Sequence, residues 1–555
     1  MENQKLAQMF DKIADALEIK GENRFKIIAY RKASQILNNL TSDIYDHYQN
    51  DELQKIPGIG EGIAKKIKEY FETGQIKKLK EAFQGLPESL LDLLSIPSLG
   101  PRTVALAYQK LKVKNLQDLE KAIRNGSLAS LPGMGEKKID NIMKGIEFLK
   151  KALGRIPLGK AFVMVNELLK ELSGWEEIKQ ISPAGSYRRM KETVGDIDIL
   201  VTSDDPKKVM DQFTALDIVA RVKAKGPTRS SIETDEGFQV DLRIVDDTSF
   251  GAALQYFTGS KAHNVKLRSL AKDKGLKINE YGVFKDEKYV AGKTEEQVYQ
   301  ALGLEFIPPE MREDLGEIEL AQKKIPRIIS YDHFPGDLHI HSTYSDGESS
   351  LKEIVEEAMK YGYKFVGIAD HSKSVKYAGG LSIEKLLEKN DEIDKLQKQY
   401  PKIRILKAAE VDILIDGSLD YPDHILSQLD VVIAAIHTGF SNDPEGRILK
   451  AMDNQYVHII AHPTGRLLSQ REAYNVDMDK LLEKASRSKK AMEINAYWDR
   501  LDLNDYDCRK AREHGVKLAI GTDSHHISGM WQMVLGIGVA RRAWLTKKDI
   551  YNFDI

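Results

Sequence analysis

The stretch Asp337–Asp346 reads DLHIHSTYSD and places two histidines between apolar neighbours. In an extended strand, residues i and i+2 project to the same side, so His339 and His341 would point together. From Gly336 onward the same order recurs: an apolar run, a His, Asp or Glu, and then a helical stretch. The runs are GDLHIHS, KFVGIADHS, IRILKAAEVDI, DVVIAAIHTG, HIIAHPTG, AMEINAYW and VKLAIGTDSHH. Seven successive βα units predict a parallel barrel, whose active-site residues lie at the carboxyl ends of the strands.

Imidazole and carboxylate side chains gather at the ends of these runs. Eleven of the 13 histidines lie between His333 and His526, which indicates metal or acid–base chemistry there. Mixed nitrogen and oxygen ligands suit Zn²⁺, Mn²⁺ or Fe²⁺ better than Mg²⁺ alone. The candidates exceed what one ion needs, so we expect two or three ions and hydrolysis of a phosphoester. The predicted ligands are His339, His341, Asp346, His371, Glu410, His437, His462, Asp523 and His525.

A second group of acids lies in the middle of the chain, in GDIDILV and FQVDLRIV. Asp196 and Asp198 alternate with isoleucines, so on a strand both carboxylates would share one face, and Asp241 lies in a second strand-like run. Carboxylates with no histidine nearby suit Mg²⁺. Two such ions can activate an attacking hydroxyl and stabilise the leaving oxygen of an in-line displacement.

Phosphate-binding groups precede this pair by a few residues. Gly185 and Ser186 offer a close backbone approach and a hydroxyl, and Arg188 and Arg189 offer forked donors. A Gly-Ser pair, an arginine pair and an Asp-x-Asp pair in so short a segment predict nucleotidyl transfer.

The N-terminal part repeats a Pro-x-x-Gly turn at residues 57–60, 97–100 and 132–135. Each copy precedes a helical pattern, and its glycines let backbone N–H groups approach a phosphate at a helix N-terminus. Such contacts position a duplex without reading its sequence. The middle copy has Ser98 where the others have glycine. The repeats predict DNA binding through Gly58, Gly60, Gly100, Gly133 and Gly135.

Composition and charge limit the expected partners and the expected cellular compartment of the protein. The net charge of -2 alone argues against a nucleic-acid protein, but residues 1–155 are basic and the remainder is acidic. No apolar run approaches the roughly 18 residues needed to span a membrane. The start MENQKLAQMF lacks the plan of a signal peptide, and the single cysteine, Cys508, fits a reducing cytoplasm.

The N-terminal turns resemble the helix-hairpin-helix motif. Together with FKIIAYRKASQIL, they are similar to the small amino-terminal domain of DNA polymerase beta and its family X relatives. In that family a lysine just after the first hairpin forms a Schiff base with an abasic sugar. Lys66 occupies the matching position, whereas Gly62 replaces a neighbouring family lysine. The resemblance therefore implies that Lys66 is the candidate lyase residue. The alternative interpretation is that Lys66 is a solvated lysine on a helix.

The middle segment, on through YFTGSKAHNVKLR, resembles the same family. The resemblance implies that Asp196, Asp198 and Asp241 hold two Mg²⁺ (or Mn²⁺) ions, with Asp241 near the primer 3′ hydroxyl. Lys261 and Val265 depart from the polymerase beta pattern, so base-pair selectivity is expected to differ. The implied substrate contacts are Gly185, Ser186 and Arg189 to the triphosphate, Tyr256, Phe257 and Gly259 to the sugar, Asn264 to the base and Arg268 to the template.

The C-terminal residues resemble the polymerase and histidinol phosphatase (PHP) domain, a trinuclear phosphoesterase barrel, and all nine of its ligand positions are present. We therefore expect a multidomain α+β and α/β chain. Its expected parts are an N-terminal helix-hairpin-helix domain (1–85), a fingers-like helix-hairpin-helix domain (86–155), a nucleotidyltransferase palm (156–245), a thumb (246–315), a linker (316–334) and a distorted (βα)₇ PHP barrel (335–555).

The combined resemblance implies a bacterial family X DNA polymerase that fills short gaps during repair. The barrel, with two or three Mn²⁺ or Zn²⁺ ions, would act as a 3′–5′ exonuclease, a 3′ phosphatase or an abasic-site nuclease. Expected partners are gapped or primed DNA and deoxynucleoside triphosphates, for a monomer in the cytoplasm, at the nucleoid and away from membranes. Two alternatives stay open: a small-molecule phosphatase with a DNA tether, and a template-independent nucleotidyltransferase.

Overall fold

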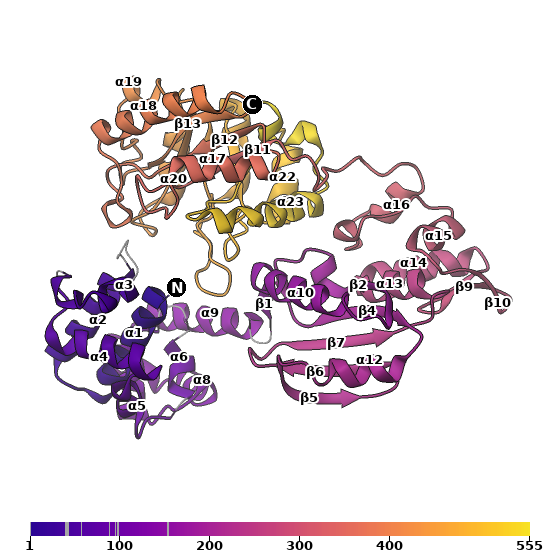
Figure 1. The fold of residues 1–555 in the computed structure, drawn as a ribbon, viewed down its shortest axis with the longest axis horizontal. Coiled ribbons are helices and arrows are strands. Elements are labelled where there is room, and N and C mark those ends of the chain that lie inside the picture. Colours follow the sequence, from indigo (N-terminus) through magenta and orange to yellow (C-terminus); the bar gives the residue numbers. More distant parts are fainter. Residues whose placement is uncertain are drawn as a thin grey trace. The chain divides into compact units, whose positions relative to one another are not determined.

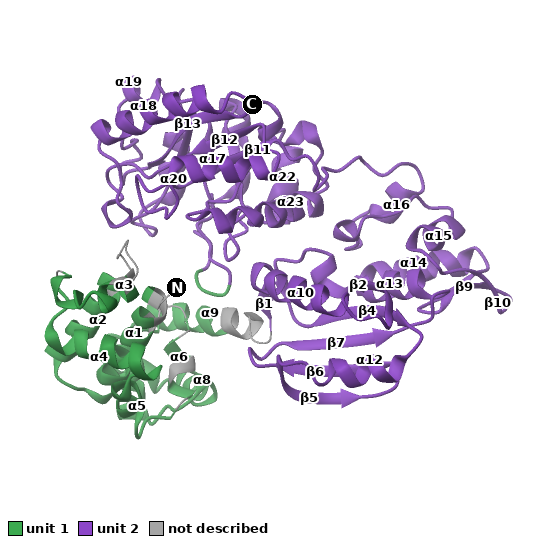
Figure 2. Ribbon diagram, in the orientation of Figure 1, with its two compact units in different colours: residues 1–153, 469–471 green, residues 154–468, 472–555 purple. Residues whose placement is uncertain are grey.

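The computed structural model describes residues 2–38, 44–56, 58–87, 89–94, 96, 99–152 and 155–555. The chain divides into two compact units (Figure 2). The first comprises Met1–Leu153 with Ser469–Arg471, and the second comprises Gly154–Leu468 with Glu472–Ile555. Pro57, Pro97 and Ser98 of the N-terminal turns lie outside the described residues.

The first unit is helical where it is described (Figure 1). Its apolar side chains form two cores: one joins the first helices around Phe10 and Ile67, and the other joins the later helices around Val104 and Ile142. This arrangement confirms the helical N-terminal region. The helices are α1 (Glu2–Lys20), α2 (Arg24–Asn38), α3 (Ile44–Gln49), α4 (Glu61–Thr73), α5 (Lys77–Phe83), α6 (Ser89–Leu94), α7 (Pro101–Leu111), α8 (Leu116–Arg124) and α9 (Glu136–Ala152), with 3₁₀ turns at Leu53–Lys55 and Leu128–Ser130.

The second unit begins with a five-stranded sheet of order β2-β4-β7-β6-β5, in which β4 and β7 are parallel and the other neighbours antiparallel. This sheet is the predicted palm. Its strands are β2 (Ile178–Pro183), β4 (Ile197–Ser203), β5 (Val219–Lys225), β6 (Arg229–Thr234) and β7 (Gln239–Ile244), accompanied by the short pair β1 (Ile156–Pro157) and β3 (Thr193–Val194) and by helices α10 (Leu158–Leu172), α11 (Gly185–Arg188) and α12 (Pro206–Phe213).

The thumb follows and has its own apolar core around Leu267, Tyr299 and Met311. A three-stranded antiparallel sheet lies among its helices. The elements are α13 (Phe250–Thr258), α14 (Lys261–Asp273), β8 (Lys277–Asn279), β9 (Gly282–Lys285), β10 (Lys288–Ala291), α15 (Glu295–Ala301), the 3₁₀ turn η3 (Pro309–Met311) and α16 (Glu317–Ala321).

Seven parallel strands follow one another in chain order, β11 to β17. A parallel bridge between Ile340 and Ser524 brings the first strand beside the last, so the sheet is a nearly closed barrel, as predicted. The strands are β11 (Gly336–Ile340), β12 (Phe365–Ile368), β13 (Arg404–Asp412), β14 (Val431–Ala435), β15 (Ile459–Ile460), β16 (Ala491–Asn495) and β17 (Leu518–Gly521). The helices are α17 (Leu351–Lys360), α18 (Ile383–Gln399), α19 (Asp423–Leu426), α20 (Pro444–Ala451), α21 (Met478–Ser488), α22 (Asp505–Glu513) and α23 (Met533–Arg542), with 3₁₀ turns at Lys376–Ala378, Ile527–Gln532, Lys547–Asp549 and Tyr551–Phe553.

Among the described residues, none of the helices combines the length and apolarity that crossing a membrane requires.

Candidate functional site

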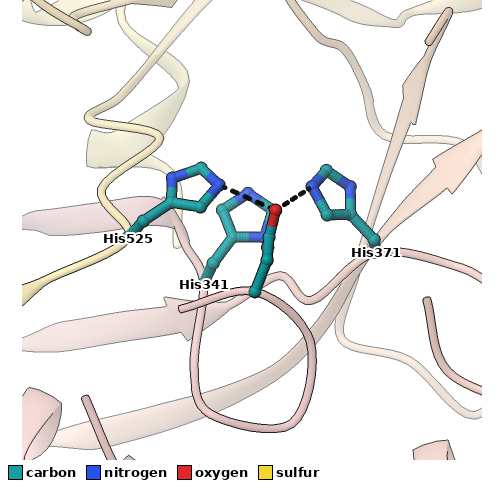
Figure 3. Close-up of side chains that lie close together, drawn as sticks. His341, His371 and His525 are labelled. Carbon is teal, nitrogen blue, oxygen red and sulfur yellow. Dashed lines mark ion pairs between the residues drawn. The ribbon is translucent and has the colours of Figure 1, made fainter. Parts of the chain in front are cut away.

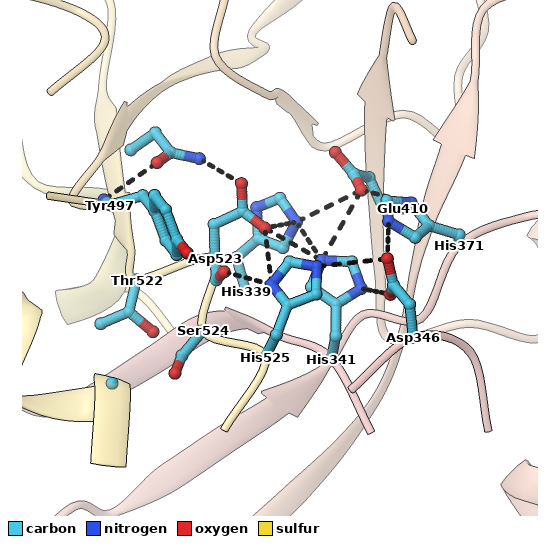
Figure 4. A network of polar contacts seen from close by, with 12 residues as sticks. His339, His341, Asp346, His371, Glu410, Tyr497, Thr522, Asp523, Ser524 and His525 are labelled. Atoms are coloured by element: carbon cyan, nitrogen blue, oxygen red, sulfur yellow. Dashed lines mark hydrogen bonds and ion pairs between the residues drawn. The ribbon is translucent and has the colours of Figure 1, made fainter. Parts of the chain in front are cut away.

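The nine residues predicted as metal ligands converge at the carboxyl ends of the barrel strands. Figure 4 labels His339, His341, Asp346, His371, Glu410, Asp523 and His525 among them. Eight of the nine fall into three overlapping groups whose ligand atoms lie within 4.8 Å of one another. The ninth, His462, places Nε2 3.0 Å from Oε1 of Glu410. The groups are His341, Asp346, His371 and His525; His339, His341 and Asp523; and His371, Glu410 and His437.

Strand β11 carries His339, and His341 directly follows the last residue of the strand; both imidazoles are fully buried. Nε2 of His339 and Nε2 of His341 lie 3.3 Å apart, as their alternation on the strand predicts. Gly521 on β17 makes room for this pair, because a Cβ there would lie 2.5 Å from the Cβ of His339. A glycine at this position is therefore needed to pack the neighbouring strands around the imidazoles.

Three imidazoles, those of His341, His371 and His525, surround the carboxylate of Asp346. Figure 3 labels these three histidines. Oδ2 of Asp346 lies 3.5 Å from Nε2 of His371 and 3.4 Å from Nε2 of His525. Burial alone would raise the pKa of Asp346, but the surrounding imidazoles hold it well below its usual value. The carboxylate is therefore ionised and available as an oxygen ligand.

Glu410 on β13 joins the groups because its two oxygens face different imidazoles. Oε2 lies 2.8 Å from Nδ1 of His371, while Oε1 lies 3.2 Å from Nε2 of His437 and 3.0 Å from Nε2 of His462. Burial alone would lower the pKa of His371, but Glu410 and Asp346 raise it to about 10. The site thus strongly favours positive charge, which divalent ions supply.

Some ligand atoms of the site have no partner within the protein, as is expected of atoms that bind a metal ion. Nδ1 of His341 and Nδ1 of His462 are buried and have no hydrogen-bond partner. A buried donor or acceptor without a partner is costly, and coordination to a cation is one way to satisfy it. Nitrogen and oxygen ligands in this mixture suit Mn²⁺ or Zn²⁺.

Two further acids, Glu493 and Asp412, are absent from the predicted set and orient the imidazoles of His339 and His437. Oε1 of Glu493 lies 2.6 Å from Nδ1 of His339, and its Oε2 accepts from the backbone N–H of His462 at 2.7 Å. Asp412 accepts from the backbone N–H of His437 and lies 3.2 Å from Nδ1 of that ring. The alternation of side chains along a strand could have predicted both acids. Asp412 lies two residues after Glu410, and Glu493 interrupts an apolar run.

The palm brings two of its three aspartates into register. Asp198 on β4 pairs with Asp241 on β7 in the parallel ladder, while Asp196 is exposed just before β4. Burial, and then the charge of Asp196, raise the pKa of Asp198 to about 6. In the described parts of the chain, the three do not form a group whose ligand atoms all lie within 4.8 Å.

Two arginines offset the negative charge of this trio. Arg229 donates to Oδ2 of Asp241 at 2.8 Å. Nε of Arg243 lies 3.8 Å from Asp198, and Nη2 of Arg243 lies 3.9 Å from Asp241. Opposite charges at these separations reduce the repulsion that gathering carboxylates would otherwise cost.

The predicted triphosphate residues lie in the short helix α11 and directly after its end. A Cβ on Gly185 would lie 2.9 Å from Oδ2 of Asp198, so this glycine allows the backbone to pass close to the acids. Ser186 and Arg189 line a cavity of about 400 Å³. Nε of Arg189 donates to Glu313 at 3.0 Å, and Arg188 holds Glu295 with both ends of its guanidinium.

The predicted sugar and base contacts lie around the end of α13. Tyr256 and Phe257 pack edge to face with ring centroids 5.1 Å apart, and Gly259 ends the helix with φ +72°. Asn264 is buried, with Nδ2 donating to the carbonyl of Tyr256 and Oδ1 accepting from Gln255. Its amide is thus bonded within the protein. The predicted template residue, Arg268, is exposed on α14.

In the first unit, Gly60 and Gly100 are the N-cap residues of α4 and α7, and neither has a side chain to satisfy the first N–H groups. Gly58 and Gly133 adopt positive φ, +93° and +79°. A Cβ at Gly60, Gly100, Gly133 or Gly135 would meet no atom within 4 Å, so these backbones face open space. Such helix starts can receive phosphates.

Lys66 on α4 lies one turn after the first hairpin. Its Nζ donates to the carbonyl of Gly62 at 2.9 Å and lies 5.8 Å from the ring centre of Tyr30. Burial lowers the pKa of Lys66. A larger share of its amine is therefore neutral, the form that attacks a carbonyl carbon.

Comparison with protein families matches five segments of the chain between residues 1 and 497. Residues 1–76 match a helix-hairpin-helix domain, residues 90–147 a SAM-like helix-hairpin-helix tandem, residues 155–242 the DNA polymerase beta palm, residues 253–313 the DNA polymerase beta thumb, and residues 337–497 the PHP domain.

Related proteins agree with this order of domains. The DNA polymerase/3′-5′ exonuclease PolX of Bacillus subtilis (strain 168) is 38% identical over 563 residues, covering 100% of this chain and 97% of the relative. DNA polymerase lambda of Rattus norvegicus is 26% identical over 342 residues, covering 56% of each chain. A probable phosphatase of Thermoanaerobacter sp. (strain X514) is 31% identical over 240 residues, covering 40% of this chain and 90% of the relative. The chain therefore belongs to the family X DNA polymerases that carry a C-terminal PHP domain.

Proposed function

We propose that this enzyme fills short gaps in DNA with its palm and thumb and removes nucleotides or phosphates from 3′ ends with its barrel. The observation that carries the proposal is the presence of two chemically different acid centres in one chain. One is a trio of aspartates without histidine, and the other is an imidazole-rich cluster. Gapped or primed DNA and deoxynucleoside triphosphates are the substrates of a monomer that acts at the bacterial nucleoid.

In the palm, Asp196, Asp198 and Asp241 would hold Mg²⁺ or Mn²⁺. Such ions, when bound, activate the primer 3′ hydroxyl and neutralise charge on the triphosphate. Ser186 and Arg189 bind the triphosphate, Tyr256, Phe257 and Gly259 contact the incoming sugar, and Arg268 contacts the template. The internal bonds of Asn264 mean that its amide must exchange a partner before it can reach a base.

In the barrel, the nine clustered residues would hold two or three Mn²⁺ or Zn²⁺ ions. Ions of this kind lower the pKa of a bound water and polarise a phosphoryl oxygen. Glu493 and Asp412 hold the rings of His339 and His437 in place, and Arg500, with Nε 3.6 Å from Asp523, adds a cation at the rim. The reaction is 3′–5′ phosphodiester hydrolysis. The same centre also removes 3′ phosphates and cleaves DNA at abasic sites.

Both alternatives raised by the sequence are less well supported. A small-molecule phosphatase with a DNA tether leaves the matched palm and thumb without a role. A template-independent transferase would extend a single-stranded primer, which a primer without template tests directly.

The experiment compares two double variants, Asp196→Ala with Asp198→Ala, and His339→Ala with His341→Ala. Gap filling and 3′–5′ hydrolysis are both measured with Mg²⁺ and with Mn²⁺. We expect the first variant to lose synthesis and keep hydrolysis, and the second to do the opposite. Asp204→Ala, an exposed acid just after β4, is the matched control. Loss of both activities in either variant, with the fold intact, would contradict two separate centres.

A further inference from the structure

Helix α23 of the barrel ends with two adjacent arginines, and the second reaches the palm. Arg542 is 4% exposed, and Nη1 donates to the backbone carbonyl of Arg189 at 2.7 Å and to Oε1 of Glu313 at 3.0 Å. Nη2 donates to Oδ2 of Asp505 at 2.7 Å. A barrel side chain thus holds the main chain of a residue proposed to bind the nucleotide triphosphate.

The same carboxylate oxygen serves both arginines. Oε1 of Glu313 accepts from Nε of Arg189 at 3.0 Å as well as from Arg542. Burial alone would raise the pKa of Glu313, but Arg189 and Arg542 lower it. An ionised Glu313 therefore holds Nε of Arg189 and Nη1 of Arg542 on one oxygen through charge-assisted hydrogen bonds.

Arg542 also lines the cavity of about 400 Å³ that contains Ser186 and Arg189, together with Lys191. Part of the cavity lining is therefore contributed by the barrel, through Asp505 and Arg542. Two acids, Glu192 and Asp505, also line the cavity, so its lining is not uniformly cationic.

We propose that Arg542 is a positioning residue for nucleotide binding in the polymerase reaction: it fixes Arg189 through the Arg189 carbonyl and through Glu313. The inference rests on the proposed role of Ser186 and Arg189 in holding the triphosphate. Its consequence is that the polymerase centre is incomplete without the barrel. When Arg542 no longer fixes Arg189, binding of the nucleotide is weakened and the chemical step is little affected. The KM for the nucleotide therefore rises while kcat changes little.

Arg541 provides a matched control. It lies beside Arg542 on α23 and also bridges the barrel to the polymerase part, with Nε 2.8 Å from Glu310 and Nη1 donating to the carbonyl of Ile329. In the described part of the chain, the side chain of Arg541 makes no hydrogen bond or ion pair with Arg189 or Glu313. A merely structural role of the contact would make the two arginines equivalent.

The test uses the full chain and single-nucleotide gap filling, with hydrolysis of a 3′ end as the second readout. For Arg542→Ala we expect the KM for the nucleotide to rise about tenfold, with kcat within about twofold and hydrolysis unchanged. Arg542→Lys, which keeps the charge but not the fork, should give an intermediate KM, and Arg541→Ala should leave it within about twofold. The Arg542→Lys variant also keeps the inference testable if the Arg542→Ala variant does not fold.

An unchanged KM in Arg542→Ala, an equal rise in Arg541→Ala, or full rescue by Arg542→Lys would overturn the inference. Arg189→Ala separates it from the proposed function. If Arg189→Ala raises the KM and Arg542→Ala does not, only the positioning role fails. If Arg189→Ala leaves the KM unchanged, the proposed triphosphate site itself fails.

Discussion

Nδ1 of His339 lies 2.6 Å from Oε1 of Glu493, and both side chains are buried at the base of the barrel's metal site. The contact leaves Nε2 of His339 facing His341 and Asp523. A carboxylate behind a ligating imidazole fixes the ring's orientation and raises its basicity as a ligand.

Glu493→Gln should therefore weaken binding of Mn²⁺ by the barrel by about 10- to 100-fold, because the amide keeps the shape but loses the charge. The measurement is 3′–5′ hydrolysis titrated with Mn²⁺, with gap filling assayed in parallel and expected to be unchanged. Glu483→Gln, an exposed glutamate on α21, is the control. Wild-type Mn²⁺ dependence in Glu493→Gln would show that this contact does not tune the site.

Lys66 should form a covalent adduct with an abasic substrate that borohydride traps, and Lys66→Ala should abolish it. Because burial lowers the pKa of Lys66, its neutral fraction at a given pH exceeds that of an exposed lysine. The trapping rate should rise with pH and level off below the usual lysine pKa.

Lys65→Ala controls for this assignment, since Lys65 is exposed on the same helix and pairs with Glu61. No adduct in the wild-type protein, or an adduct that survives Lys66→Ala, would exclude Lys66 as the nucleophile.

Lys389 supports the barrel from within. Its Nζ donates to the carbonyls of Ile368 and Ala408 and lies 3.4 Å from Oδ2 of Asp370, with both charged side chains fully buried. Lys389→Met leaves Asp370 without its cation and should destabilise the barrel by about 3–5 kcal/mol. Calorimetry resolves separate transitions in a multidomain chain, and the barrel's transition should move to lower temperature.

Lys385→Met, the same substitution at an exposed site one turn earlier on α18, should leave that transition in place. Adding Asp370→Asn to Lys389→Met should restore part of the lost stability, because no unpaired charge then remains buried. Equal effects of the two methionine substitutions would argue against the buried pair.

Regular local patterns made the fold predictable. Each barrel strand is an apolar run followed by a polar residue, so even the two-residue strand β15 was identified from HIIAHPTG. The same rule brought together the nine clustered residues, because parallel strands end at one edge. The domain boundaries and the roles of the site residues stay predictions.

Contacts between distant segments were not predictable from local pattern. The sequence places Asp198 on a strand but not its register with Asp241, nor the arginine that holds Asp241. Glu493 was overlooked because it lies inside an apolar run rather than after it. The bond from Arg542 to the Arg189 carbonyl joins residues 353 apart, and no spacing rule reaches that far.

The most direct test of two separate metal centres is anomalous scattering from a crystal soaked in Mn²⁺. We predict two or three peaks among the imidazoles of the barrel, bounded by His339, Glu410 and His525, and at least one further peak between Asp198 and Asp241. A barrel without a peak beside its imidazole nitrogens, or a palm that stays empty when nucleotide and Mn²⁺ are both supplied, would contradict the account.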